Sequence, residues 1–278
     1  MHTRPTQPIE IAQSQRHARE ITLRGLGKRD VAAKVETMGE GRPVVFLHGL
    51  AGLNDHWEDT VQLAHANFRC VMLEIPLLEL EGDDCSIDGV AALTQDFLSR
   101  HLDDRAVLVG NSFGGHVALR LAIEHPRLVR GLVLAGSSGL NERTMVAEVR
   151  LRPTREWMSR KIGELFFDKS KMREADVDRA FAELGERRRA RAMVRLSRSA
   201  RRNHLGDEIG RITAPTLIVW GREDVVTPPD AAHEFNAKIR DSSIVWYDRC
   251  GHAPMLEWPD LFADSVSAFV RDLAARGL

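Results

Sequence analysis

The sequence has few cysteines, almost no net charge and no long apolar run, and each shortage excludes a class of protein. The three cysteines, Cys70, Cys85 and Cys250, are far apart and odd in number, so we expect neither a disulfide framework nor a CxxC zinc site. With 39 Lys and Arg against 40 Asp and Glu, the chain lacks the basic excess that binding to phosphate backbones requires. No apolar run is long enough to cross a bilayer.

Residues 1–20 are polar and contain no apolar stretch of signal-peptide length. We therefore expect a cytoplasmic protein that has no nucleic-acid partner and does not insert stably into membranes. The 278 residues are enough for one large domain, or for one domain with an insertion, that buries most of its apolar surface. Nothing in the pattern indicates an oligomeric state.

Short apolar runs alternate with amphipathic segments along most of the chain. The runs, which are typical of strands buried on both faces, are residues 44–47, 70–75, 106–110, 131–136, 216–221 and 243–247. The amphipathic segments 87–101, 113–125 and 258–275 are long enough to be helices. This alternation predicts an α/β fold with a parallel sheet covered on both faces. The weaker alternation of residues 21–38 predicts two antiparallel edge strands.

The strand pattern is interrupted between residues 141 and 206. This segment has 18 Lys and Arg against 10 Asp and Glu, and its apolar residues recur mostly at three- and four-residue spacings. We predict a helical insertion over residues 141–206, with the sheet domain formed by residues 1–140 and 207–278. Most arginines of its densest basic stretch, residues 187–195, are expected to be solvated because they point in several directions around one helix.

The strongest local motif is VGNSFGGH at residues 109–116, between a predicted strand and a predicted helix. Gly110 and Gly114 flank Ser112 in the G-x-S-x-G pattern of a nucleophile elbow, whose sharp turn leaves no room for larger neighbours. The amide of Phe113 is then placed to donate to an oxyanion. The alternative interpretation is a glycine-rich turn with no catalytic role.

A serine nucleophile needs a base, and the base needs a carboxylate to orient it. Asp224 and His252 follow the predicted strands 216–221 and 243–247, at the sheet edge where sites of open α/β folds lie. Glu223 is a second carboxylate in the same loop as Asp224. Another motif, FLHGLAG, follows the first apolar run and offers the Leu50 amide as a second oxyanion donor, with His48 bracing the turn.

Taken in order, the motifs HGLAG, GNSFG, GREDVVTP and CGHAP resemble those of the α/β-hydrolase superfamily. The resemblance implies an eight-stranded, mostly parallel sheet with a helical cap inserted after the sixth strand, where residues 141–206 lie. It also implies a Ser-His-Asp triad of Ser112, His252 and Asp224 that acts on a small-molecule substrate. Asp224 rather than Glu223 holds the position of the family's acid, so we expect Glu223 to be solvated. This chemistry requires no metal and no organic cofactor, and we expect none.

Two hydrolytic chemistries compete for the serine. The first is hydrolysis of small or medium acyl esters or lactones. The second is carbon–carbon hydrolysis of the meta-cleavage-product type, which GNSFGG with Asn111 and the CGH motif resemble. Those enzymes use a tryptophan where this chain has Ala253 and a cap arginine that aligns with Arg179 only after a shift, so we favour the esterase. A non-catalytic receptor for a small ligand on the same fold is the third alternative.

Four residues are expected to contact the substrate. Asn111 and Arg179 are suggested by the resemblance to the carbon–carbon hydrolases. Met255 follows the predicted base and is expected to wall the site. Trp57 follows the oxyanion loop and is equally compatible with lining the acyl pocket and with packing against a helix.

Overall fold

The computed structural model describes residues 16–27, 29–50, 52–140 and 154–278. These residues form one eight-stranded sheet with the order β1-β2-β4-β3-β5-β6-β7-β8. The strands are His17–Leu23 (β1), Val31–Met38 (β2), Pro43–Leu47 (β3), Arg69–Glu74 (β4), Ala106–Asn111 (β5), Val129–Ala135 (β6), Thr216–Gly221 (β7) and Ser242–Tyr247 (β8). The pairs β1–β2 and β2–β4 are antiparallel and the others are parallel, which confirms the predicted mostly parallel sheet.

The sheet is buried on both faces, which explains its continuous apolar runs. In β3, Val45 and Leu47 belong to one apolar cluster, whereas Val44 and Phe46 belong to another. Successive side chains of a strand point to opposite faces, so these clusters are the two sides of the sheet. All six predicted apolar runs form strands, and the antiparallel edge strands predicted within residues 21–38 are β1, which begins earlier at His17, and β2.

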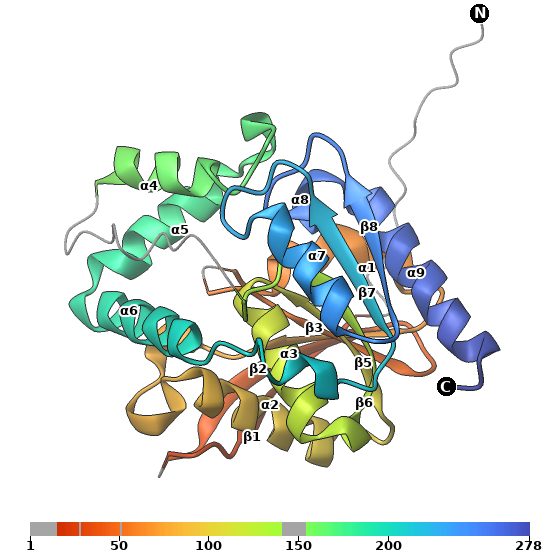
Figure 1. The fold of residues 1–278 in the computed structure, drawn as a ribbon. Helices are drawn as coiled ribbons and strands as arrows, with labels where there is room; N and C mark the ends of the chain where they lie inside the picture. Colours follow the sequence, from red (N-terminus) through yellow and green to blue (C-terminus); the bar gives the residue numbers. More distant parts are fainter. Residues whose placement is uncertain (1–15, 28, 51, 141–153) are drawn as a thin grey trace, which may run out of the picture.

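Helices cover both faces of the sheet (Figure 1). Apolar residues of α2, α3 and α7 join the first cluster, and those of α1 and α9 join the second. The helices are Glu58–Ala64 (α1), Ile87–His101 (α2), Phe113–Glu124 (α3), Arg155–Gly163 (α4), Glu174–Gly185 (α5), Arg187–Arg202 (α6), Pro229–Lys238 (α7), Pro254–Glu257 (α8) and Pro259–Ala275 (α9). Thus α2, α3 and α9 form where the amphipathic pattern predicts them.

Between β6 and β7 the described chain is helical, as predicted. Helices α4, α5 and α6, coloured green to teal in Figure 1, lie together on one side of the molecule. Helix α6 buries Ala192, Leu196 and Ala200, while Arg191 and Arg195 of the basic stretch are exposed. The first part of the predicted insertion, residues 141–153, lies outside the described residues, so its limits stay a prediction.

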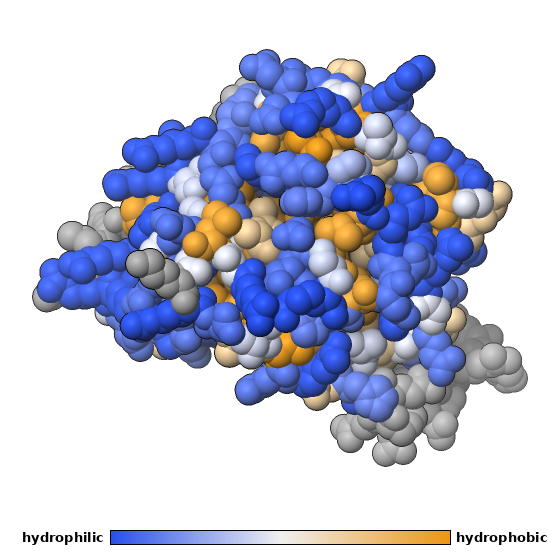
Figure 2. Space-filling model, turned by 90° about the horizontal axis from the view of Figure 1, so that it is seen from below, coloured by the Kyte–Doolittle hydropathy of each residue, from blue (hydrophilic) through white to orange (hydrophobic). Residues whose placement is uncertain are grey.

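The surface drawn in Figure 2 is mainly hydrophilic, and its apolar residues occupy small areas between polar ones. Among the described residues, no helix combines the length and the apolar character that crossing a membrane requires.

His116 is completely buried in α3, four residues after Ser112. Burial, with a smaller contribution from the positive charge of Arg120, lowers the pKa of His116 to about 3. The imidazole is therefore neutral in the folded protein at neutral pH and in mild acid, and it serves the packing beneath the serine turn.

This buried imidazole makes the free energy of unfolding depend on pH. An unfolded histidine takes up its proton near pH 6.5, so below this pH the unfolded state binds more protons and the folded protein loses stability. Between pH 6 and the folded pKa of about 3, the free energy of unfolding is expected to fall by about 1.4 kcal/mol for each pH unit. Urea unfolding of the wild type and His116→Met between pH 7 and pH 5 measures it. The variant should lose less stability on acidification, whereas the exposed-site control His17→Gln should follow the wild type; equal slopes for all three would contradict the assignment.

Candidate active site

Ser112 occupies a sharp turn between β5 and α3. Its backbone has φ 53° and ψ −117°, in a region that costs a non-glycine residue about 1–3 kcal/mol. Two hydrogen bonds hold the turn: the Ser112 amide donates to the Ala135 carbonyl oxygen over 3.1 Å, and the Ser138 amide donates to the Ser112 carbonyl oxygen over 3.1 Å. Such strain is typical of a side chain that the fold presents at a functional site.

The glycines on either side of Ser112 are required by close backbone packing. A Cβ atom on Gly110 would lie 2.5 Å from the Gly114 carbonyl oxygen, and one on Gly114 would overlap the Leu47 carbonyl oxygen of β3. The steric interpretation of the G-x-S-x-G motif therefore agrees with the structure, which forms a nucleophile elbow.

The second half of the site is a buried His–Asp pair. His252 Nδ1 donates to Asp224 Oδ2 over 2.9 Å, and the two side chains are 5% and 0% exposed. Asp224 Oδ1 accepts from the amides of Val226 (2.8 Å) and Thr227 (2.9 Å), which fixes the carboxylate. With Nδ1 occupied, Nε2 is the ring nitrogen that remains to accept a proton, and both His252 and Ser112 line one cavity.

Thr227 completes this pair and was not identified from the sequence. Its Oγ1 lies 2.8 Å from Asp224 Oδ2, 3.1 Å from His252 Nδ1 and 3.0 Å from the Gly136 carbonyl oxygen. The side chain is fully buried, so its hydroxyl keeps the carboxylate and the imidazole at a set separation. The signal was present in GREDVVTP, where a hydroxyl residue follows the acid by three positions.

Glu257 ties the His252 loop to the chain between α4 and α5, and it was also missed. Its buried carboxylate accepts from the amides of Gly251 (2.6 Å), Phe167 (3.0 Å) and Asp168 (3.0 Å). Burial raises the pKa of the Glu257 carboxyl, against the effect of these amides. A second link is direct, because the His252 amide donates to the Leu165 carbonyl oxygen over 2.7 Å.

The loop after β3 lies beside the serine. Leu50 and Phe113, the predicted oxyanion donors, line the cavity together with Ser112. Phe113 is the first residue of α3, so its amide lies among those without an acceptor inside the helix. His48 is buried and its Nδ1 lies 2.9 Å from the Gly49 carbonyl oxygen, as expected for a residue that braces the turn.

The cavity has a volume of about 160 Å³ and a mainly apolar lining from the sheet domain and from α4 to α6. Met255 lines it, as predicted. Asn111 also lines it, but its Nδ2 donates to the carbonyl oxygens of Ala135 (2.9 Å) and His252 (3.1 Å). Its amide hydrogens therefore hold the protein backbone, and its contact with the substrate stays a prediction.

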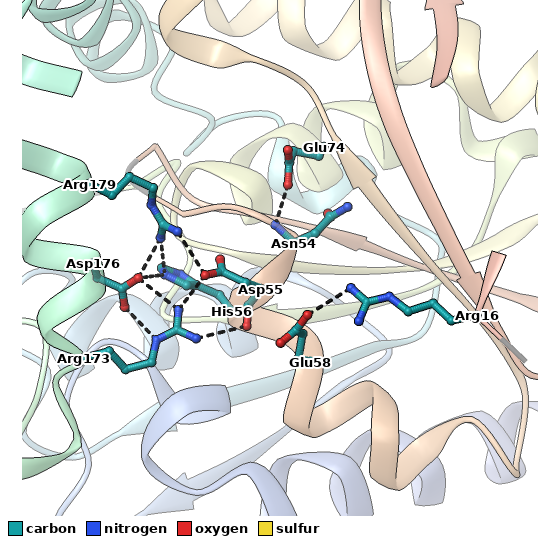
Figure 3. Close-up of polar contacts among 9 residues, drawn as sticks. All are labelled: Arg16, Asn54, Asp55, His56, Glu58, Glu74, Arg173, Asp176 and Arg179. Carbon is teal, nitrogen blue, oxygen red and sulfur yellow. Dashed lines mark hydrogen bonds and ion pairs between the residues drawn. The ribbon is translucent and has the colours of Figure 1, made fainter. Parts of the chain in front are cut away.

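Two predicted substrate contacts lie elsewhere. Trp57 is fully buried between Phe46 and Phe262, with ring centroids 5.3 and 6.0 Å away, so the packing interpretation is correct and the pocket interpretation is wrong. Arg179 lines an adjoining cavity of about 240 Å³. Its guanidinium binds Asp55 (3.0 Å) and Asp176 (2.7 Å), as Figure 3 shows, so its charge is already neutralised.

Glu223 differs in detail from the expectation of a solvated side chain. It is exposed, but its Oε2 accepts a hydrogen bond from the Cys250 amide over 2.9 Å.

The sequence matches a model of the alpha/beta hydrolase family over residues 44–265, which is most of its length. The chain belongs to this family. The matched region contains the serine turn and both members of the His–Asp pair.

Two curated members of the hydrolase family illustrate the range of reactions among the relatives. A 2-hydroxy-6-oxo-6-(2'-aminophenyl)hexa-2,4-dienoic acid hydrolase from Metapseudomonas resinovorans is 28% identical over 84% of this chain and 85% of its own. A pimeloyl-[acyl-carrier protein] methyl ester esterase from Nitrosomonas europaea is also 28% identical, over 84% of this chain and 98% of its own. Similarity alone therefore supports a hydrolase and leaves both chemistries open.

A solved serine hydrolase involved in carbazole degradation has a similar fold. It is 26% identical, with a TM-score of 0.77 over 92% of this hydrolase and 99% of the other chain.

The elbow of this hydrolase predicts an asymmetric effect of two glycine substitutions. Gly114→Ala should lower the free energy of unfolding by about 2–3 kcal/mol, because the methyl group meets the fixed carbonyl of Leu47. Gly185→Ala, in α5 with open space around it, should be neutral or stabilising by up to about 1 kcal/mol. Denaturant unfolding measures both; equal stabilities would contradict the packing described for the elbow.

Proposed function

We propose that the protein is a serine carboxylesterase that acts on small or medium acyl esters or lactones through an acyl-enzyme. The observation that carries this proposal is the arrangement of Ser112 and the bonded pair His252–Asp224 at one apolar cavity. The apolar lining suits an acyl chain.

In the proposed mechanism, His252 Nε2 takes the proton of Ser112 Oγ as the oxygen attacks the ester carbonyl carbon. The amides of Leu50 and Phe113 stabilise the negative oxygen of the tetrahedral intermediate. His252 then gives its proton to the leaving alcohol, which departs as the acyl-enzyme forms. Water, deprotonated by His252, then attacks the acyl carbonyl carbon. The bond between this carbon and Ser112 Oγ breaks, His252 returns the proton to Oγ, and the acid is released. Asp224 keeps the imidazole in the required tautomer and stabilises its protonated form.

We further propose that residues 141–206 form a cap on a sheet domain of residues 1–140 and 207–278. The cavity supports this division, because Ile162, Phe166 and Met193 of the inserted segment line it together with Ser112. We also propose a cytoplasmic location, which suits the three buried and unpaired cysteines.

Carbon–carbon hydrolysis is the second candidate, and the dienoic acid hydrolase among the relatives favours it. Two features of this chain weigh against it. Arg179 is engaged by Asp55 and Asp176, so it brings no unpaired positive charge to a substrate carboxylate. Ala253, which lines the cavity, stands at the position where the carbon–carbon hydrolases have a tryptophan. A non-catalytic receptor remains the third candidate.

The three candidate functions predict turnover of different substrates. We expect the wild type to hydrolyse nitrophenyl esters of short and medium acyl chains, and Ser112→Ala to lose at least about a thousandfold in kcat/KM because the nucleophile is removed. A 2-hydroxy-6-oxo-dienoate should be cleaved far less efficiently. Preferred cleavage of the dienoate would replace the esterase with the carbon–carbon hydrolase. Absence of serine-dependent turnover on both classes would favour the receptor.

Two substitutions of Thr227 are expected to lower the rate of the same reaction to different extents. Thr227→Val keeps the shape of the side chain but removes the hydroxyl between Asp224 and His252, so kcat should fall roughly tenfold with little change in KM. Thr227→Ser keeps the hydroxyl and should retain most of the activity. Steady-state kinetics on one nitrophenyl ester measures this, and equal kcat values for the valine and serine variants would show that the hydroxyl has no positioning role.

A further inference from the structure

His56 provides a polar group in a cavity that is otherwise mainly apolar. It lies in the 3-10 turn Asn54–Trp57, directly after the oxyanion loop, and its side chain is 14% exposed. It lines the same cavity as Ser112, together with Gly52 of the loop and Asp176 of α5. No step of the proposed mechanism uses it.

The contacts of Nε2 determine which ring nitrogen carries the proton. Arg179 Nη2 lies 3.3 Å from His56 Nε2, and an arginine has only hydrogen-bond donors, so Nε2 accepts. Asp176 Oδ1 is farther from Nε2, at 3.5 Å, and already accepts from Arg179 Nη2 over 2.7 Å. An imidazole that accepts at Nε2 has its proton at Nδ1.

Nδ1 points toward the loop beside the serine. A Cβ atom on Gly52 would lie 2.9 Å from His56 Nδ1, so the glycine leaves space in front of this nitrogen. Within the part of the chain that the structure describes, His56 Nδ1 has no hydrogen-bond partner, whereas Nε2 has one. A donor directed into a ligand cavity fixes which group of the ligand is placed there.

The charges around His56 balance (Figure 3). Arg173 binds Asp176 over 2.9 Å and Asp55 over 3.1 Å, and Arg179 binds the same two carboxylates. Burial acts to raise the pKa of Asp176, but the neighbouring His56 and Arg173 outweigh it and hold that pKa well below its usual range. Two guanidinium groups and two carboxylates leave no excess positive charge to attract an anion.

We propose that His56 is a specificity-determining residue whose Nδ1–H donates to an uncharged oxygen of the substrate, away from the bond that is cleaved. The preferred substrates are then esters whose acyl part has a second, neutral acceptor such as a ketone or ether oxygen. A carboxylate at this position would face Asp176 and gain no net charge attraction. This inference rests on the proposed esterase function, because it concerns the substrate of the same cavity.

A matched pair of esters tests the proposal: nitrophenyl 4-oxopentanoate and nitrophenyl pentanoate, which have the same chain length. For the wild type, kcat/KM should favour the oxo ester by roughly threefold to tenfold, the range of one hydrogen bond. His56→Phe should abolish this preference, and His56→Asn, which keeps an N–H near the position of Nδ1, should retain part of it. The control His233→Phe, on the exposed face of α7, should keep the wild-type ratio. The ratio is compared rather than the absolute rate, so a partly destabilised variant remains informative.

Three results would overturn the assignment: no preference in the wild type, an unchanged ratio in His56→Phe, or a stronger preference for the nitrophenyl monoester of butanedioic acid, which would indicate an anion site. Calorimetric binding of the two esters to Ser112→Ala and to Ser112→Ala/His56→Phe provides a second readout. If the wild type shows no serine-dependent turnover, the esterase proposal fails. The binding ratio then still decides the role of His56.

Discussion

The close approach of the backbone at the turn between β5 and α3 is the constraint on which the rest of the site depends. Because Gly110 and Gly114 have no side chains, α3 starts directly against β3 and Ser112 adopts its strained conformation. This contact brings the serine beside the loop that follows β3, so one packing requirement places Ser112, Phe113 and Leu50 at the same cavity. The parallel sheet then brings the loops after β7 and β8, with Asp224 and His252, to the same edge.

The sheet could be predicted well from the sequence because strands that are buried on both faces consist mainly of apolar residues. Every strand from β3 to β8 overlaps one of the predicted apolar runs, and Ser112, Asp224 and His252 follow three of these runs within a few residues. The direction of single side chains was harder to predict. Trp57 follows a cavity loop but points into the core, and Arg179 lies in a cavity-forming helix but binds Asp55 and Asp176. Sequence spacing specifies neighbours along one element, whereas these contacts join elements distant in the chain.

Thr227 and Glu257 were missed for a related reason. Both are polar residues in loops or at a short helix, where exposure is the usual expectation, and both are buried. Their partners are backbone groups and side chains up to 91 positions away in sequence, such as the Gly136 carbonyl. Buried polar groups with several partners hold loops in one arrangement, which a pattern of apolar residues does not report.

Two contacts join the His252 loop to the connection between α4 and α5, and they have an evolutionary consequence. The first is the hydrogen bond from the His252 amide to the Leu165 carbonyl oxygen. The second is the Glu257 carboxylate, which accepts from the amides of Gly251, Phe167 and Asp168. Helices α4 to α6 contribute residues to the cavity, so exchanging them is one way to alter the substrate that fits there. In this protein such an exchange would also affect the His252 loop, because residues 165–168 support the backbone at His252. A transplanted segment preserves the alignment of His252 only if it presents a carbonyl and two amides at the same places. Diversification of this lineage is therefore expected to conserve the connection between α4 and α5 while the cavity-facing residues of those helices vary.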